Sequence, residues 1–329
     1  SMIGERMTGI MDYIDIARQI IEERLYGIRP GDLAAVSAKI SNNYHSSNKT
    51  SQRLISDELQ ALVYAAVRMP ATYAAVRSAL EKSLMYNDIN IDTVIDVGAG
   101  TGAASLAAAD MFALGHLSLI EREDCMRKCG MEIFAAMQSE ITVKAQWYDE
   151  DILNDNADRH ADLVMSSYMI NEIKLQDREN VFDRLWNMAD KMLLIVEPGT
   201  KEGFEVISHA REYFLAGGMH IAAPCTHENK CGLDKDDWCH FSVRVARSRI
   251  HKLIKEADVP YEDEKFSYIA IVKDDVTSDG MRILRHPDIR KGNIGLRVCD
   301  SQGIRNTIIT KKDGELFKKA RKSSAGDII

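Results

Sequence analysis

The fold of this chain is decided by the stretch Thr93-Val94-Ile95-Asp96-Val97-Gly98-Ala99-Gly100-Thr101-Gly102. Its first five residues are mostly β-branched and suit a buried parallel strand, and its three glycines let the backbone turn tightly and approach a ligand. The alanine-rich run from Ala103 is typical of a helix, whose free N–H groups and positive dipole end would face that ligand. The stretch therefore predicts a strand, a glycine turn and a helix that hold a nucleotide-like cofactor.

The surroundings of the glycine turn narrow the kind of cofactor. A second apolar run ends in Glu121, 23 residues after Gly98, the distance expected of a carboxylate that holds two ribose hydroxyls. A dinucleotide-binding fold would show G-x-G-x-x-G, whereas the spacing Asp96-x-Gly98-x-Gly100-x-Gly102 resembles the first motif of class I S-adenosylmethionine-dependent methyltransferases. The alternative is an ordinary strand-to-helix turn that binds nothing.

Strands and helices alternate from residue 91 to about residue 215, which indicates a Rossmann-like α/β fold with a parallel sheet. The predicted strands are Thr93–Val97, Leu117–Glu121, Ile141–Trp147, Ala161–Ser167 and Lys191–Glu197. Ligands of such sheets bind at the loops after the strands, and Asp151 follows the third strand, where an acid often holds an adenine amino group. The predicted cofactor site consists of Asp96, Gly98, Ala99, Gly100, Gly102, Glu121, Asp151 and Ser167.

Two further parts flank this fold, and an insertion lies within it. Helical periodicity predicts an N-terminal helical bundle over residues 1–90, with one helix ending at Pro70 and the next running from Ala71 to Leu84. Residues 91–275 are expected to form the methyltransferase-like domain, which contains a cysteine-rich insertion over residues 217–242, a helix carrying five basic residues and a strand over Phe266–Val272. Residues 276–329 read as a small β appendage with a basic tail. The five basic residues of the expected helix are Arg244, Arg247, Arg249, Lys252 and Lys255.

The composition and charge of the chain restrict its cellular location and the kind of partner that it can bind. The chain has 329 residues and a net charge of −8, and no apolar stretch approaches the length of a membrane span. No signal peptide is recognisable, so we expect a cytoplasmic protein, or a mitochondrial one if a targeting segment has been removed. From Arg282 to Lys322, however, 12 Lys and Arg stand against four Asp and Glu. This asymmetry predicts a basic face for an acidic partner rather than general nucleic-acid affinity.

Four of the six cysteines suggest a metal site. Cys225, Cys231 and Cys239 occur close together in a loop, and Cys299 follows at the end of a predicted strand. Four thiolates satisfy either a tetrahedral zinc ion or an iron–sulfur cluster. The absence of C-x2-C pairs favours the cluster without excluding zinc, His227 or His240 could replace one thiolate, and buried free thiols are the plain alternative.

Five motifs of the chain occur together: the glycine turn, Arg68-Met69-Pro70-Ala71-Thr72-Tyr73, Val196-Glu197-Pro198-Gly199-Thr200, the cysteine segment and Asp237-Trp238-Cys239-His240-Phe241-Ser242-Val243-Arg244. This combination resembles the small-ribosomal-subunit methyltransferase-like family, which has bacterial members and a mitochondrial-ribosome assembly branch. The resemblance implies S-adenosylmethionine binding, a [4Fe-4S] cluster and association with small-subunit ribosomal RNA during assembly. The implied cluster ligands are Cys225, Cys231, Cys239 and Cys299. The chain departs from the family at Thr226 and Gly232, where proline is usual, and at Ala325, where tryptophan is expected.

The residues after the fourth strand leave the reaction open. A methyltransferase acting on exocyclic nitrogen often carries Asn or Asp, Pro-Pro and an aromatic residue there, whereas this chain has Ser166-Ser167-Tyr168-Met169-Ile170-Asn171-Glu172. Tyr168 is a candidate for stacking a base, and Asn171 or Glu172 for accepting a proton. The chain is therefore either an active rRNA methyltransferase or an assembly factor that keeps the cofactor fold and cluster as a docking scaffold. Further alternatives are a zinc-stabilised methyltransferase acting on another RNA or a protein, and a redox sensor.

Overall fold

The computed structural model describes residues 11–45, 57–85, 87–137, 140–141, 143–155, 158–255, 258–276 and 279–329. Its helices are α1 (Tyr13–Leu25), α2 (Pro30–His45), α3 (Glu58–Leu84), α4 (Ala103–Met111), α5 (Asp124–Ala136), α6 (Leu175–Met188), α7 (Lys201–Ala216), α8 (Arg249–Lys255) and α9 (Glu315–Lys322), with 3-10 turns η1 (Ile170–Glu172) and η2 (Lys311–Asp313). Its strands are β1 (Thr93–Val97), β2 (His116–Ile120), β3 (Lys144–Tyr148), β4 (Ala161–Ser167), β5 (Ala189–Pro198), β6 (His220–Ala223), β7 (Phe241–Ala246), β8 (Tyr261–Val272), β9 (Arg282–Ile283), β10 (Asp288–Arg290), β11 (Asn293–Asp300) and β12 (Gly303–Thr310).

The chain divides into two compact units. The first unit comprises Ser1–Arg77, Asn90–Asp190 and Arg244–Glu264. The second comprises Ser78–Ile89, Lys191–Val243 and Lys265–Ile329. Among the described residues, no helix is both long and apolar enough to cross a membrane.

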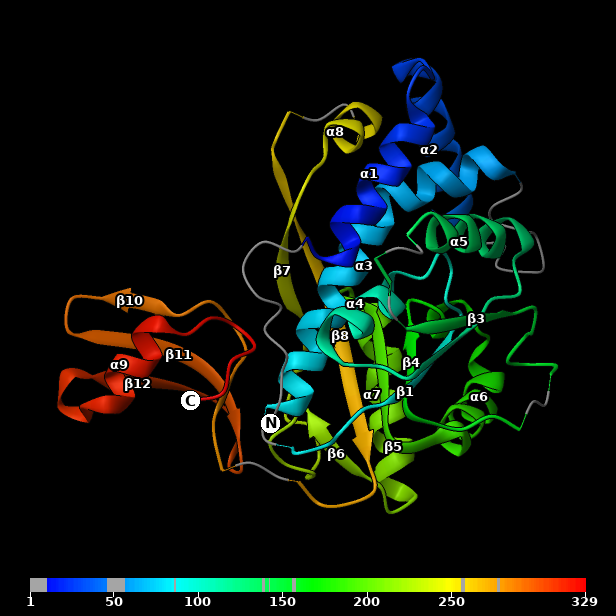
Figure 1. Cartoon of the computed structure of the whole chain (residues 1–329). Helices are drawn as coiled ribbons and strands as arrows, with labels where there is room; N and C mark the ends of the chain where they lie inside the picture. The colour runs from blue at the N-terminus through cyan, green and yellow to red at the C-terminus, as the bar shows by residue number, and fades with distance from the viewer. Residues whose placement is uncertain are drawn as a thin grey trace. The chain divides into compact units, whose positions relative to one another are not determined.

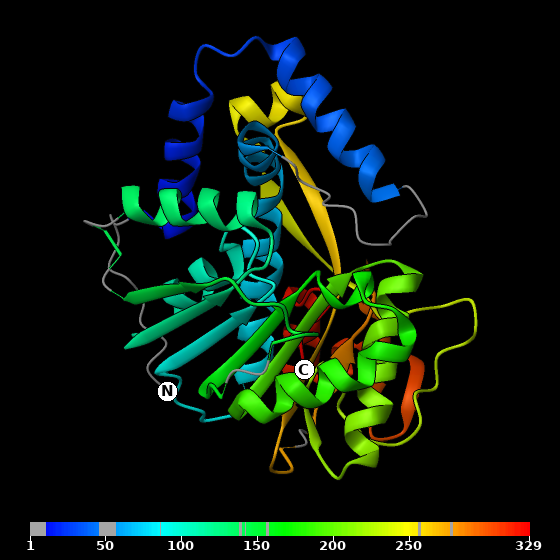
Figure 2. The ribbon, with the colours of Figure 1, turned by 90° about the vertical axis from the view of Figure 1, so that its right-hand side faces the viewer.

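The first unit is built on a parallel sheet in the order β3-β2-β1-β4, which Figure 2 shows as a twisted row of strands. In β1, Val94 pairs with Leu117 of β2 and with Leu163 of β4. Four of the five β1 residues are buried, as expected for a strand covered on both faces. The predicted β-branched run therefore forms a central strand, and the glycine turn follows its carboxyl end.

Helices of the first unit are fixed to this sheet and to one another by specific contacts. The Phe134 ring of α5 meets the Trp147 ring of β3 edge-on, with 5.4 Å between the ring centroids. Asp110 of α4 accepts hydrogen bonds from the backbone N–H of Tyr13 at 2.9 Å and from the hydroxyl of Tyr73 at 2.8 Å. One buried carboxylate thus joins α1, α3 and α4.

Helix α3 corrects the prediction that Pro70 ends a helix. The helix runs unbroken from Glu58 to Leu84 with Pro70 inside it. A proline in a helix interior removes one hydrogen bond and costs about 3 kcal/mol. Here the residues around Pro70 are almost all buried, including Met69, Ala71 and Tyr73, and their burial offsets that loss.

The second unit has an antiparallel sheet in the order β5-β8-β6 and a separate four-stranded antiparallel sheet formed by β9 to β12. Helix α9 lies on β11 and β12 (Figure 1), and this appendage has its own apolar core of Ile283, Ile294, Leu296, Val298, Ile309 and Ala320. The chain thus has the predicted class I methyltransferase, Rossmann-like α/β fold, with a mixed sheet and a small C-terminal antiparallel sheet.

Strand β7 corrects the prediction of a helix that carries Arg244. Residues 241–246 form a strand, and the helix α8 begins only at Arg249. Phe241 and Val245 are buried whereas Ser242, Arg244 and Ala246 are exposed, so the burial repeats every second residue as in a strand. The basic residues from Arg244 onward predicted a helix, but the alternation of buried and exposed positions over residues 241–246 favours a strand.

Candidate functional site

The glycine turn is attached to the end of β2. The backbone N–H groups of Gly98 and Ala99 both donate to the carbonyl oxygen of Ile120, at 2.9 and 3.0 Å. Gly98, Gly100 and Gly102 have φ angles of +71°, +57° and +95°, a conformation that favours glycine. A Cβ added to Gly98 would lie 2.6 Å from the sulfur of Met169, and one added to Gly102 would lie 2.6 Å from the Phe134 ring. Packing alone therefore requires two of the three glycines.

Gly100 differs from the other two glycines. A Cβ at this position would meet only the terminal methyl carbon of Met126, at the ordinary contact distance of 3.5 Å. Its N–H donates to the Glu121 carboxylate at 2.7 Å. The protein leaves space beside Gly100 that a ligand could occupy.

The carboxylate of Glu121 is held in a fixed position. One oxygen accepts the N–H of Gly100 and the other accepts the N–H of Glu123, both at 2.7 Å. The residue is 7% exposed, and burial raises the pKa of its carboxyl while these two hydrogen bonds oppose the shift. Each oxygen keeps a further lone pair, so the carboxylate remains able to accept from a ribose hydroxyl.

Asp96 is the most deeply buried acid of the predicted site. Its residue exposure is 0%, and the Ser105 hydroxyl donates to its Oδ2 at 2.7 Å. Its Oδ1 has no hydrogen-bond partner among the described residues. Burial raises the pKa of Asp96 to about 7, against the hydrogen bond from Ser105, and the nearby Glu121 raises it further. A buried carboxylate oxygen without a partner favours the approach of a cationic or hydrogen-bond-donating group.

Asp151 organises the loop after β3. Its carboxylate accepts from the N–H of Leu153 at 3.0 Å and from the side-chain amide of Asn154 at 2.9 Å, and it pairs with Arg122 at 3.3 Å. These contacts fix the loop and leave Asp151 half-buried. The predicted role in holding an adenine amino group remains a prediction.

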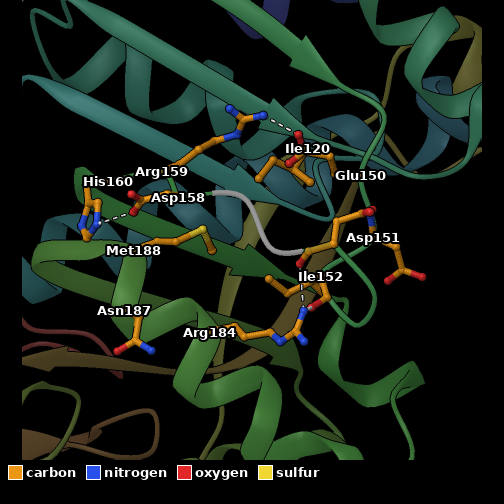
Figure 3. Close-up of a pocket in the computed structure, with 11 residues that line it drawn as sticks. Ile120, Glu150, Asp151, Ile152, Asp158, Arg159, His160, Arg184, Asn187 and Met188 are labelled. Atoms are coloured by element: carbon orange, nitrogen blue, oxygen red, sulfur yellow. Dashed lines mark hydrogen bonds and ion pairs between the residues drawn. The ribbon is translucent and has the colours of Figure 1, made fainter.

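A cavity of about 510 Å³ lies beside this loop (Figure 3). It shares Ile120 and Asp151 with the region of the predicted site, but none of the three turn glycines lines it. Arg184 of α6 closes one side by donating from Nη1 to the carbonyl oxygens of Ile152 and Asp155, at 2.8 Å each. Sequence reasoning missed Arg184 because its partners are backbone atoms about thirty residues away, which leave no pattern in the sequence.

Tyr168 follows β4 in a strained conformation. It is the one non-glycine residue of the described chain with a positive φ, +57°, and such a conformation costs roughly 1–3 kcal/mol. Its hydroxyl donates to Glu264 Oε1 at 2.9 Å, and the guanidinium of Arg68 lies 5.3 Å from the centre of its ring. Arg68 also donates to both Glu264 oxygens, at 2.8 and 3.2 Å. Tyr168 is thus held by residues 68 and 264, which only the fold brings together.

The other candidates after β4 differ in exposure. Ser166 is fully buried, and its hydroxyl has no hydrogen-bond partner within the described residues, while Ser167 is half-buried. Asn171 is half-buried and Glu172 exposed, and both lie in η1. The proposed proton-accepting roles of these two residues stay predictions.

All four predicted ligand cysteines lie in the second unit, and all six thiols of the chain are free. Thr226, next to Cys225, donates its hydroxyl to the carbonyl oxygen of Cys299 at 3.0 Å, and Ser267 donates to the carbonyl oxygen of Cys239 at 2.6 Å. The cysteine loop, residues 224–240, is thereby joined to β8 and β11. Burial raises the pKa of the Cys239 thiol, and the nearby thiols of Cys225, Cys231 and Cys299 raise it further.

Two buried arginines hold the cysteine loop. Arg211 of α7 is 4% exposed and donates to the carbonyl oxygens of His227 and Asn229, at 3.1 and 2.7 Å, as well as to the Cys225 thiol. Arg282 of β9 is 1% exposed and donates to the carbonyl oxygens of Pro224 and Gly326, at 2.9 and 2.7 Å. Both guanidinium groups lower the pKa of Cys225, although burial raises it overall.

The basic residues of residues 244–252 and 282–322 differ from one another in burial and in ion pairing. Arg282 is buried, and Arg285 and Arg297 both pair with Asp237 of the cysteine loop. Exposed cations of the appendage gather instead on η2 and α9, namely Lys311, Lys312, Lys318, Lys319, Arg321 and Lys322. In the first unit, Arg244 pairs with Asp263 at 3.1 Å and Arg247 with Glu262 at 3.1 Å. Arg249 and Lys252 of α8 form no ion pair with any described residue.

Comparison with known proteins identifies related sequences. The family model described as "Rsm22: Mitochondrial small ribosomal subunit Rsm22" matches residues 58–329. The "Ribosome assembly protein METTL17, mitochondrial" of Homo sapiens is 25% identical over 308 residues, which cover 87% of this chain and 66% of that protein. "Rsm22-cox11 tandem protein 2, mitochondrial" of Schizosaccharomyces pombe is 26% identical over 328 residues, covering 82% of this chain and 43% of that protein. The chain thus spans less than half of the tandem protein and about two thirds of the human relative.

The solved structures that are similar to this chain include methyltransferases whose sequence identity to it is low. The magnesium protoporphyrin IX methyltransferase of Synechocystis PCC 6803 with bound SAH is 12% identical with a TM-score of 0.42, over 78% of this chain and 100% of that one. The plantazolicin methyltransferase BpumL in complex with SAH has the same identity, TM-score and coverage.

Proposed function

The chain belongs to the Rsm22 family, and from this premise we propose that it is an S-adenosylmethionine-binding assembly factor of the small ribosomal subunit. In this proposal it carries a [4Fe-4S] cluster on Cys225, Cys231, Cys239 and Cys299 and binds small-subunit rRNA. The observation that carries the proposal is that Cys225, Cys231 and Cys299 all lie near enough to Cys239 to raise the pKa of its thiol, inside one unit that also holds two buried arginines. The relative named as a ribosome assembly protein supports the cellular role.

In the described part of the chain, the cysteine thiols are not gathered as closely as a single zinc ion requires. A tetrahedral zinc ion with Zn–S bonds of about 2.3 Å brings its sulfur atoms to about 3.8 Å from one another. Within the described residues, no three cysteine sulfur atoms lie within 4.8 Å of one another. Cys225 and Cys231 are nevertheless near enough to raise the pKa values of both Cys239 and Cys299. In an iron–sulfur cluster each thiolate binds a different iron atom, so the four sulfur ligands lie further apart than they do around one metal ion.

Charge supports the same assignment. Four thiolates in a partly buried site need positive charge nearby, because the desolvation of anions is otherwise costly. Arg211 and Arg282 supply two guanidinium groups beside Cys225, and Arg285 lowers the pKa of Cys239 against the effect of burial. When bound, the cluster would add a rigid link among four positions and a one-electron redox centre.

The predicted cofactor site suits S-adenosylmethionine, which carries a sulfonium and an α-ammonium group. The buried, partnerless Oδ1 of Asp96 and the fixed carboxylate of Glu121 favour a ligand with positive charge and hydroxyl donors. The space beside Gly100 lets such a ligand approach the backbone. In this proposal, Asp151 and Ser167 complete the adenine side of the site.

Anaerobic purification tests the cluster. We expect about four iron atoms and four sulfide ions per chain in the wild type, and loss of most of the iron in Cys299→Ser. Cys129→Ser is the matched control, because Cys129 is also buried but lies on α5 in the first unit. Stoichiometric zinc, or equal iron in Cys299→Ser and the wild type, would contradict the assignment.

A second candidate function, methyl transfer to small-subunit rRNA, is favoured by the strained backbone of Tyr168. Strain of this kind persists at sites where geometry matters for chemistry, and Tyr168 directly follows the end of β4. Incubating the cluster-loaded protein with small-subunit rRNA and methyl-labelled S-adenosylmethionine tests it. Incorporation that disappears in Gly100→Val would establish transfer, whereas no incorporation by a wild type that binds both ligands would leave the docking role.

A further inference from the structure

His220, Glu228 and Asp275 form a group that the sites above do not use. His220 begins β6, Glu228 lies in the cysteine loop, and Asp275 follows β8. One potential ligand atom of each residue lies within 4.8 Å of the other two. It is the one group of three such side chains in the part of the chain that the structure describes. Segments distant in sequence therefore bring an imidazole and two carboxylates together.

The carboxylate of Glu228 is held against the imidazole of His220. The Nδ1 atom of His220 lies 3.1 Å from both Oε1 and Oε2 of Glu228. Oε1 also accepts the backbone N–H of Ile221 at 3.1 Å, which fixes the orientation of the carboxylate. Ligands held by such additional hydrogen bonds are already arranged before a metal ion arrives. His220 and Glu228 have side chains 30% and 27% exposed, so an ion can reach them from solvent.

His160 also has two acidic neighbours, but their arrangement differs from that around His220. Its Nε2 lies 3.3 Å from Asp158 and its Nδ1 lies 3.4 Å from Asp190. The two carboxylates are thus on opposite ring nitrogens and cannot share one ion with the imidazole. At His220, in contrast, both oxygens of Glu228 face the same nitrogen.

We propose that His220, Glu228 and Asp275 bind one divalent metal ion. Two carboxylates balance the charge of such an ion, and one imidazole with carboxylate oxygens suits a metal such as Mn²⁺, which takes oxygen and nitrogen ligands. Thiolates prefer softer metals, so this group and the cysteines select different ions. Water molecules fill the remaining coordination positions. The bound ion joins the cysteine loop to β6 and to the segment after β8.

Titration with Mn²⁺ tests the proposal on the cluster-loaded protein, or on the protein as purified if no cluster is present. The paramagnetic resonance signal of free Mn²⁺ reports the amount bound. We expect one ion per chain in the wild type, with affinity reduced at least tenfold in Glu228→Gln and in His220→Ala. The glutamine keeps an oxygen that can accept from Ile221 while it removes the charge, so this variant should fold.

His160→Ala is the matched control and should bind Mn²⁺ as the wild type does. A thermal melt of each variant without metal verifies that it is folded, and added Mn²⁺ should raise the melting temperature of the wild type and of His160→Ala only. Equal affinity in the wild type and in a folded Glu228→Gln would overturn the proposal, as would the absence of any bound Mn²⁺ in the wild type.

Discussion

At the scale of single residues, Asp96 links the predicted cofactor site to stability. An unfolded aspartic acid loses its proton near pH 4, whereas burial raises the pKa of the folded Asp96 to about 7. Between these values the folded state holds a proton that the unfolded state has released. The free energy of unfolding therefore falls as the pH rises from 4 to 7, by up to about 1.4 kcal/mol per pH unit from this group.

Asp96→Asn should remove this slope, because an amide does not titrate and its oxygen can still accept from Ser105. Denaturant unfolding at several pH values between 4.5 and 8 measures the difference from the wild type. Asp158→Asn, whose side chain is 98% exposed, is the control and should keep the wild-type slope. Parallel curves for Asp96→Asn and the wild type would show that Asp96 does not hold a proton in this range.

Gly100 is the turn glycine at which a substitution changes the packing of the protein least. Gly100→Ala should weaken S-adenosylmethionine binding, and Gly100→Val should abolish it, because the new side chain enters the space beside the turn. Gly218→Ala is the matched control, since Gly218 also has a positive φ, +79°, and open space around its Cα. Calorimetric titration should give wild-type affinity for Gly218→Ala. Unchanged affinity in Gly100→Val would place the cofactor elsewhere.

At the scale of elements, α8 provides a test of RNA binding. Arg249 and Lys252 of α8 form no ion pair with a described residue and are free to contact phosphate, whereas Arg244 and Arg247 pair with Asp263 and Glu262. The double variant Arg249→Gln with Lys252→Gln should weaken binding to small-subunit rRNA and reduce the salt slope by about 1 for each lost contact. The double variant Arg244→Gln with Arg247→Gln should change the slope less. Filter binding across a salt series distinguishes these results, and equal effects would contradict the role of α8.

Strand β1 and helix α3 show which features of the fold can be predicted from the sequence and which cannot. The strand Thr93–Val97 and the turn after it were predictable because β-branched residues and spaced glycines act locally, and the family resemblance rested on motifs that are contiguous in the chain. The continuation of α3 past Pro70 was not predictable, since it depends on burial by neighbours that only the fold supplies. Two other contacts also join segments that are distant in the sequence, so the sequence could not predict them. Tyr168 contacts residues 68 and 264, and Arg211 donates hydrogen bonds to the cysteine loop.

At the scale of the whole molecule, the cysteine loop and the appendage belong to one unit whose order should depend on metal. Cys299 lies in β11, paired with both Arg282 of β9 and Ile304 of β12. Cys299→Ser should therefore increase amide hydrogen exchange in residues 282–310 and leave residues 93–120 of the first unit unchanged. The control Cys129→Ser should leave both regions at the wild-type rate. Equal exchange in residues 282–310 of Cys299→Ser and the wild type would mean that the appendage is ordered without the cluster.

The buried arginines have a consequence for the speed of metal loading. Arg211 and Arg282 already bind the carbonyl oxygens of Pro224, His227 and Asn229, so the loop loses much of its conformational freedom when the chain folds. If the four cysteines bind the proposed cluster, an incoming iron–sulfur unit would meet a loop that needs little rearrangement. Delivery to the folded apo-protein should be limited by encounter with the donor rather than by a slow search of the loop, and the observed rate should rise in proportion to donor concentration.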